Sequence, residues 1–190
     1  MTSPTETEVK IPLAASPSEF AERLRTAGFR ISKPRLFESN TLYDTSEKAL
    51  RARGVLLRLR EVDGKGVITW KGVALPGPHK NRPELETTVG SKDTLAQILG
   101  ELGLNPTFRY EKYRTEFRRS GEPGVVTVDE TPIGNFLELE GPGDWIDSTA
   151  AQLGFSTQNY VLESYGKLYV QHCEKLGLRP THMTFLPAAG

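Results

Sequence analysis

Charged residues recur at every second position in several segments of the chain. Glu6, Glu8 and Lys10 stand at i, i+2 and i+4 of one such segment, so a strand would carry all three on one face. The same spacing recurs at Arg58 and Arg60, at Arg82, Glu84 and Glu86, at Lys112 and Arg114, and at Glu138 and Glu140. The positions between them are often apolar, as at Val9 and Leu59. Each of these strands is therefore expected to have one apolar face and one charged face.

Two arrangements could produce this pattern. An antiparallel sheet with one face in water normally carries charge on that face. However, like charges at i and i+2 repel each other, and a solvated face would more naturally mix the two signs. A sheet that closes into a barrel with its charged face inward explains the pairs, provided that the buried charges find partners or bound ions. Such an interior would need both a polyanion and a cation.

The residue types indicate which ions these would be. Paired carboxylates are hard oxygen ligands that suit Mg²⁺ or Mn²⁺. Clusters of arginine and lysine suit phosphate oxygens, which arginine can bind through two parallel hydrogen bonds. Phosphoryl transfer needs mainly positioning and charge neutralisation, and this set of side chains can supply both. The sequence therefore predicts a cavity for a metal-bound polyphosphate.

The chain must supply enough strands to build such a cavity. Period-two alternation and glycine-containing turns predict about eight strands, over residues 5–11, 35–43, 55–62, 67–71, 84–89, 108–118, 125–130 and 136–140. Helices are expected after Ser16, before Gly54, and over residues 91–102, 145–153 and 159–176. This order predicts an α+β fold on an antiparallel sheet. Residues 1–178 are expected to form one domain, and residues 179–190 a loose C-terminal tail.

Composition narrows the class of protein. The 190 residues include 24 Lys+Arg and 24 Asp+Glu, so the formal net charge is zero, which argues against a protein that coats nucleic acid or an anionic membrane. No apolar run approaches the length of a membrane span, and residues 1–10 are polar rather than signal-like. Cys173 is the only cysteine, which excludes an intramolecular disulfide and a thiolate metal cluster. We expect a cytoplasmic monomer or homodimer whose partner is a small molecule.

Several segments resemble motifs of the CYTH family, which includes class IV adenylyl cyclases, thiamine triphosphatases and inorganic triphosphatases. The family signature E-x-E-x-K stands at residues 6–10. Further matches follow in order at residues 43–45, 57–60, 69–72, 84–86, 112–114, 129–130 and 133–140. E-x-E-x-K alone is a weak pattern in any charged protein, whereas this series of motifs in register is specific. The resemblance covers nearly the whole chain, as far as Tyr165.

The resemblance implies an eight-stranded antiparallel β-barrel with flanking helices, whose tunnel holds a triphosphate and Mg²⁺ or Mn²⁺. It implies catalytic and metal-binding roles for Glu6, Glu8, Glu138 and Glu140, with Asp129 as a further metal ligand. It implies that the triphosphate is bound by Lys10, Arg58, Arg60, Lys71, Lys112 and Arg114. Glu84 and Glu86 match acidic strand positions with a supporting metal or water role, and Arg82 is a further candidate. Lys167 either closes over the substrate or is a solvated surface lysine.

The activity expected from this resemblance is metal-dependent hydrolysis of inorganic triphosphate or of a nucleoside or organic triphosphate, with water attacking a terminal phosphoryl group. One alternative is a class IV adenylyl cyclase, in which the ribose 3′-hydroxyl of ATP attacks the α-phosphorus and pyrophosphate leaves. Another is a binding module for polyphosphate or nucleotides that catalyses nothing. Leu56 stands where mammalian-type thiamine triphosphatases carry tryptophan, so the sequence does not indicate thiamine specificity.

Other features carry no chemistry by themselves. Residues 64–66, Gly-Lys-Gly, fit a hairpin turn rather than a phosphate-binding loop. The histidines His79, His172 and His182 lack metal-ligand spacing. Trp70 directly precedes Lys71 and should therefore point out of the cavity. Residues 75–80 are expected to form a loop that could close over the tunnel mouth.

Overall fold

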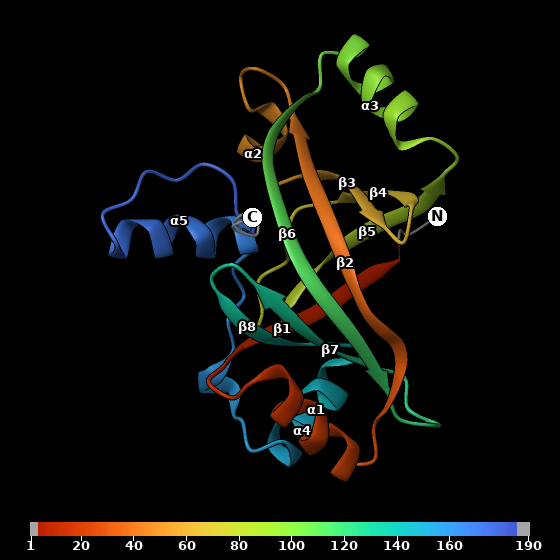
Figure 1. Cartoon of the computed structure of the whole chain (residues 1–190), viewed down its shortest axis with the longest axis vertical. Coiled ribbons are helices and arrows are strands. Elements are labelled where there is room, and N and C mark those ends of the chain that lie inside the picture. Colours follow the sequence, from red (N-terminus) through yellow and green to blue (C-terminus); the bar gives the residue numbers. More distant parts are fainter. Residues whose placement is uncertain (1–3, 186–190) are drawn as a thin grey trace, which may run out of the picture.

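The computed structural model describes residues 4–185. Within this range, eight strands close into one antiparallel barrel in the order β1-β5-β4-β3-β2-β6-β7-β8, which confirms the predicted eight-stranded α+β fold. The strands are β1 (Thr5–Leu13), β2 (Arg30–Asp44), β3 (Leu56–Val62), β4 (Lys65–Lys71), β5 (Lys80–Val89), β6 (Asn105–Arg118), β7 (Val125–Thr131) and β8 (Gly134–Glu140). The long strands β2 and β6 pair along one side of the barrel (Figure 1).

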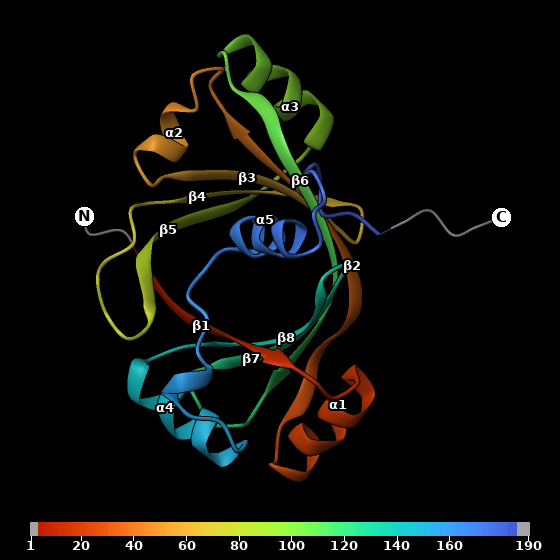
Figure 2. The same cartoon turned by 90° about the vertical axis from the view of Figure 1, so that its left-hand side faces the viewer.

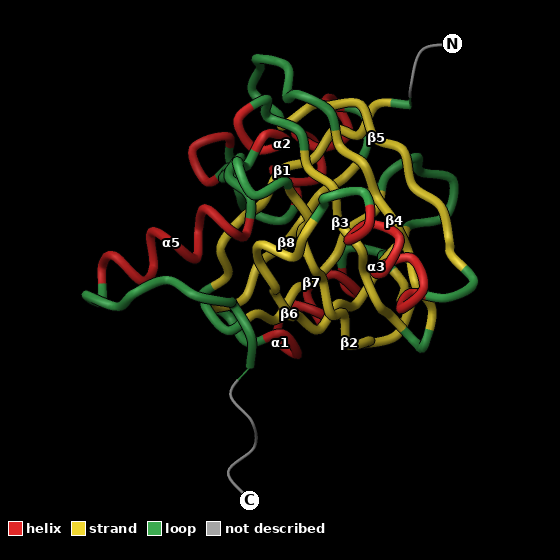
Figure 3. Tube along the Cα trace, turned by 90° about the horizontal axis from the view of Figure 1, so that it is seen from above, coloured by secondary structure: helices red, strands yellow, loops and turns green. Residues whose placement is uncertain are grey.

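Five helices flank the barrel in the described part of the chain. They are α1 (Pro17–Thr26), α2 (Ala49–Ala52), α3 (Lys92–Glu101), α4 (Gly143–Gln152) and α5 (Tyr165–Lys175), with a 3₁₀ turn at Thr157–Asn159. α1 and α4 lie at one end of the molecule and α3 at the other (Figure 1). α5 lies across the opening of the strand ring (Figure 2) and projects beyond the barrel when seen from above (Figure 3). None of the helices within residues 4–185 has the length and apolar character needed to span a membrane.

The apolar faces of the strands point outward, beneath the helices. Val9 and Ile11 of β1, and Leu137 and Leu139 of β8, are almost completely buried. They pack in one core with side chains of α1 and α4, among them Phe20, Leu24, Trp145 and Ile146. Because side chains alternate along a strand, the charged residues between these positions point into the barrel. The structure thus shows the closed barrel with an inward charged face, and not the solvated sheet.

Local sequence signals set the ends of several elements. The Ser16 hydroxyl accepts a hydrogen bond from the Glu19 backbone N–H, and the Glu19 carboxylate accepts one from the Ser16 N–H, which fixes the start of α1. The β3–β4 hairpin turns at Asp63 and Gly64, whose φ angles of 50° and 69° suit a two-residue turn. This turn sets the register that places Arg58 opposite Thr69. Both features agree with the sequence prediction.

The helix predicted over residues 159–176 begins too early, because its first six residues are not helical in the way predicted. α5 begins only at Tyr165, because the Ser164 hydroxyl accepts a hydrogen bond from the Lys167 backbone N–H and caps the helix there. Before the cap the chain is extended. Val161 exchanges two backbone hydrogen bonds with Lys10 of β1, at 3.1 and 2.8 Å. The segment is therefore used to extend the wall of the barrel.

The chain after α5 also differs from the loose tail predicted for residues 179–190. Met183 is fully buried. Its N–H donates to the carbonyl of Arg109, and its carbonyl accepts from the N–H of Glu111, at 3.0 and 2.9 Å. Apolar contact drives this docking, since Met183 packs in one cluster with Tyr110 and Tyr165. Residues up to 185 are thus held against β6, while residues 186–190 lie outside the described range.

Candidate active site

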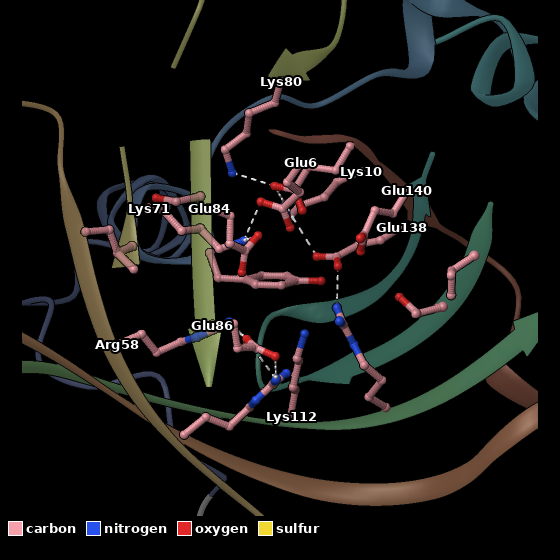
Figure 4. A pocket seen from close by; sticks show the side chains of 18 of the residues that line it. Glu6, Lys10, Arg58, Lys71, Lys80, Glu84, Glu86, Lys112, Glu138 and Glu140 are labelled. Carbon is pink, nitrogen blue, oxygen red and sulfur yellow. Dashed lines mark hydrogen bonds and ion pairs between the residues drawn. The ribbon is translucent and has the colours of Figure 1, made fainter. Parts of the chain in front are cut away.

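The interior of the barrel encloses a charged cavity of about 360 Å³. Side chains from all eight strands and from the start of α5 line it (Figure 4). The lining includes most of the residues that the sequence predicts for the site: Glu6, Glu8, Lys10, Arg58, Arg60, Lys71, Arg82, Glu84, Glu86, Lys112, Arg114, Glu138 and Glu140. Asp129 and Lys167 are not part of the lining. Trp70 is also absent from it, as its position beside Lys71 predicts.

Four carboxylates form what we call the acidic wall: Glu6 and Glu8 of β1, Glu84 of β5 and Glu140 of β8. Strand pairing brings them together, since β1 lies between β5 and β8 and places Glu8 directly opposite Glu140. Lys71 bridges two of them, with its Nζ 2.5 Å from Glu6 and 3.1 Å from Glu84. Figure 4 shows Glu6, Glu84 and Glu140 converging on the same region of the cavity.

The acidic wall carries more negative charge than its lysines neutralise. Burial raises the pKa of Glu84 to about 7, with Lys71 opposing and Glu6 adding to the shift. Burial also raises the pKa of Glu140, and the charges of Glu6 and Glu8 raise it further. Among the described residues, Glu140 forms no ion pair, whereas Glu8 is paired by Lys10 and Lys80 at 2.9 and 2.6 Å. The wall therefore retains a demand for a further positive charge.

The chemistry of this wall fits a divalent cation. Carboxylate oxygens are the ligands that Mg²⁺ and Mn²⁺ prefer, and a cation would relieve the repulsion that raises the pKa of Glu140. Within residues 4–185, however, no group of three His, Cys, Asp or Glu side chains is arranged to hold a metal ion. The ammonium groups of Lys71 and Lys80 lie against the carboxylates instead. Metal binding here requires these ammonium groups to move away from the carboxylates, and a phosphate would be a suitable new acceptor for them.

The opposite side of the cavity is a basic wall, formed by Arg58 and Arg60 of β3 and by Lys112 and Arg114 of β6. Arg58 contacts Glu86 at 3.4 Å, and Arg60 contacts the same carboxylate at 3.2 Å. The Nε–H groups of both arginines are buried without a hydrogen-bond acceptor in the described structure. Unsatisfied buried donors are costly, so they suit an anion that enters the cavity.

Asp129 anchors the basic wall and does not fit the predicted role of metal ligand. Its side chain is fully buried. The carboxylate accepts two hydrogen bonds from Arg114, at 2.7 and 2.6 Å, one from Lys112 at 2.8 Å and one from the Tyr165 hydroxyl at 2.8 Å. Four donors occupy its two oxygens, which leaves little capacity for a metal. Its charge instead fixes the positions of Lys112 and Arg114.

Of two further predicted residues, Lys167 takes one of its two expected positions, and Glu138 lies in different surroundings from those expected. The Lys167 side chain is 62% exposed and pairs with Glu163 on the outside of α5, so its position fits a surface lysine. Glu138 lies between the two walls and pairs with Arg114 and Lys10. Burial raises the pKa of Glu138, but Arg114 and Lys10 outweigh burial and hold it well below its usual range. The negative charge of Glu138 is thus balanced by cations of the protein, whereas that of Glu140 is not.

The sequence prediction missed several residues of the site, among them Glu38, Lys80 and Tyr165. Glu38 is buried in the basic wall, 3.3 Å from Arg60. Lys80 stands two positions before Arg82, so a longer period-two series on this strand would have included it. Tyr165 belongs to a helix, and strand periodicity therefore gives no signal for it.

Comparison with known proteins identifies the family of this barrel. A model of the CYTH domain matches residues 4–169. The chain belongs to the CYTH domain family. Members of the CYTH family are triphosphatases or adenylyl cyclases that act on small triphosphates and depend on divalent metals.

Individual relatives agree with this assignment. A Methanocaldococcus jannaschii protein named "putative adenylate cyclase" is 27% identical over 136 residues, which cover 71% of this chain and 75% of the relative. A Vibrio parahaemolyticus structure with the same description has a TM-score of 0.75 at 20% identity and covers 88% of this chain and 98% of its own. A Hippeastrum protein, described as a "putative adenylyl cyclase" with a dominant triphosphatase activity, has a TM-score of 0.60 at 15% identity and covers 93% and 97%. The two structures share the CYTH fold.

Proposed function

We propose that this protein hydrolyses inorganic triphosphate, or a nucleoside or organic triphosphate, with the help of Mg²⁺ or Mn²⁺. The proposal rests on one observation: the acidic wall and the basic wall line the same cavity of about 360 Å³. A triphosphate with its metal presents charges complementary to both walls. The two sets of buried charge then satisfy each other through the ligand, as buried charges require.

The basic wall supplies the groups that bind the phosphates. Arg58 and Arg60 have buried Nε–H groups without acceptors in the described structure, and Lys112 and Arg114 lie nearby on β6. These cations stabilise the negative charge on the transferring phosphoryl group and on the departing phosphate. Lys71 contacts the acidic wall and turns from its carboxylates to the incoming phosphates. This exchange frees carboxylate oxygens at the same time.

The acidic wall supplies the residues that would hold the metal ion, namely Glu6, Glu8 and Glu140. A bound divalent ion would neutralise phosphate charge and lower the pKa of a coordinated water. The three carboxylates belong to two paired strands of a closed barrel, so their distance from the basic wall is fixed by the fold. Carboxylate oxygens also accept hydrogen bonds from water, which orients the nucleophile towards the phosphate chain.

Adenylyl cyclase chemistry is the second candidate function, and the name of the Methanocaldococcus jannaschii relative supports it. That reaction requires the cavity to hold adenosine as well as the phosphates. A volume of about 360 Å³ lies at the small end of the roughly 300–1,000 Å³ of ligand pockets. The aromatic side chains of the described lining, Tyr110 and Tyr165, are more than nine-tenths buried and offer little surface for stacking a base. These features favour hydrolysis.

Product analysis tests the proposal. Purified protein is incubated with Mg²⁺ or Mn²⁺ and either inorganic triphosphate or ATP. Orthophosphate supports hydrolysis, and cyclic AMP with pyrophosphate supports the cyclase. Tight binding with neither product would refute both and indicate a binding module. Glu140→Gln should abolish metal-dependent turnover, whereas Glu101→Gln on the exposed surface of α3 should leave it unchanged.

A further inference from the structure

Tyr165 enters the wall of the cavity from outside the barrel, as the first residue of α5. Its ring lies against two ammonium groups from different strands. The Nζ of Lys10 is 5.3 Å from the ring centroid, and the Nζ of Lys112 is 5.2 Å from it. Both distances are within the reach of a cation–π interaction, which extends to about 6 Å. One side chain thus touches cations of β1 and β6.

The hydroxyl of Tyr165 extends the same contact to a third cation. It donates a hydrogen bond of 2.8 Å to Asp129. That carboxylate also binds Lys112 and Arg114, at 2.8 and 2.6 Å. Through its ring and its hydroxyl, Tyr165 therefore influences the positions of Lys10, Lys112 and Arg114.

The position of Tyr165 is itself firmly set. The preceding extended segment is joined to the backbone of Lys10 through Val161, by two hydrogen bonds. The Phe136 ring meets the Tyr165 ring edge-on, with the centroids 5.4 Å apart, and the Ser164 hydroxyl caps the helix that follows. The segment from Val161 to Tyr165 thus holds Lys10 at its backbone and at its ammonium group.

We propose that Tyr165 is a positioning residue that holds the cations of the site in place for the phosphates. A carboxylate that holds a lysine also cancels its charge, as Glu8 and Glu138 do for Lys10. An aromatic face attracts an ammonium group through its quadrupole and leaves the full charge in place. Such support orders Lys10 and Lys112 without cancelling any more of their charge. The inference rests on the proposed function in that the anion is a triphosphate.

Binding of inorganic triphosphate, measured by calorimetry in EDTA so that no hydrolysis occurs, tests this role. Tyr165→Leu removes the ring and should weaken binding about tenfold. Tyr165→Phe keeps the ring and should remain within about threefold of the wild type. Tyr169→Leu is the control, since Tyr169 lies on the same helix and packs against Phe108 instead of the lysines. It should bind as the wild type does.

Three binding results would overturn the role: wild-type affinity in Tyr165→Leu, equal weakening in Tyr165→Phe and Tyr165→Leu, or equal weakening in the Tyr169→Leu control.

NMR of the lysine side chains in the unliganded protein gives an independent readout. The ε-methylene signals of Lys10 and Lys112 should show an upfield ring-current shift that persists in Tyr165→Phe. Absence of that shift in the wild type would refute the proposal, even if Tyr165→Leu does not fold. If the wild type binds triphosphate neither in EDTA nor with Mn²⁺, the proposed function fails, while the NMR result still decides whether the ring holds the lysines.

Discussion

The pH dependence of stability should report the ion pairs of Glu38. This residue of β2 is 4% exposed, and its carboxylate lies 3.3 Å from Arg60 and 3.7 Å from Lys112. Burial raises the pKa of Glu38, but the charges of Lys112, Arg114 and Arg60 outweigh burial and lower it from 4.5 to about 2. The folded protein therefore favours the ionised carboxylate more strongly than the unfolded chain does.

The size of this effect follows from the linkage between proton binding and folding. The pKa of Glu38 falls from 4.5 in the unfolded chain to about 2 in the folded protein. At about 1.36 kcal/mol for each unit of pKa, this shift contributes about 3 kcal/mol of stability. Because the pKa is lower in the folded state, the contribution is complete above the unfolded value. It is lost as the pH falls from 4.5 towards 2. At neutral pH, replacing the carboxylate by an uncharged group should remove it.

Glu38→Gln tests this reasoning, since glutamine has nearly the shape of the protonated side chain. In urea unfolding at pH 7 the variant should be about 3 kcal/mol less stable than the wild type. The difference in stability should shrink steadily below pH 4.5, because Glu38 of the wild type becomes protonated there. Other buried carboxyl groups titrate in both proteins, so their effects cancel in the comparison. Glu101→Gln, at an exposed position, should change little at any pH. A wild-type minus variant difference that does not vary with pH would refute the electrostatic explanation.

Three further changes test other parts of the molecule. Glu140→Gln should weaken Mn²⁺ binding, measured by calorimetry without substrate, at least about tenfold because a carboxylate ligand is lost; unchanged affinity would move the metal site elsewhere. Arg58→Glu should weaken triphosphate binding about a hundredfold, since a buried donor becomes a like charge, and equal affinity would leave Arg58 with a purely structural role. Gly124→Ala should cost about 1–3 kcal/mol in thermal unfolding, because a Cβ there would lie 2.2 Å from the Trp145 ring. An unchanged Tm would show that α4 can shift.

Strand periodicity predicted the fold and the composition of the cavity because it is a local property that the barrel preserves. When Val9 and Leu139 face the helices, their charged neighbours must face inward, whatever the exact register. Closure was one of two arrangements that the sequence allowed, and single-sign pairs such as Arg58 and Arg60 favoured it over a solvated face. The resemblance to CYTH motifs then implied that these strands form one eight-stranded barrel.

The separate roles of the inward residues could not be predicted in the same way. Asp129 and Glu140 occupy similar inward positions, yet Asp129 is enclosed by four donors and Glu140 forms no ion pair within residues 4–185. This difference depends on cross-strand register and on which partners reach each oxygen, and the sequence shows neither. Tyr165 and Met183 reach the barrel from a helix and a terminal segment. Their docking depends on tertiary contacts that no local pattern encodes.

The enclosure of both walls in one barrel constrains what the cavity can bind. Buried charge must be neutralised locally, and the unliganded interior achieves this by internal pairs such as Lys71 with Glu6 and Arg60 with Glu38. A phosphate chain alone would draw the basic groups away and leave carboxylates unpaired, and a cation alone would leave ammonium groups unpaired. Only a ligand that brings both signs can replace the internal pairs without a charge penalty. Metal ion and triphosphate should therefore bind together more tightly than either binds alone, and each should raise the affinity for the other by the same factor.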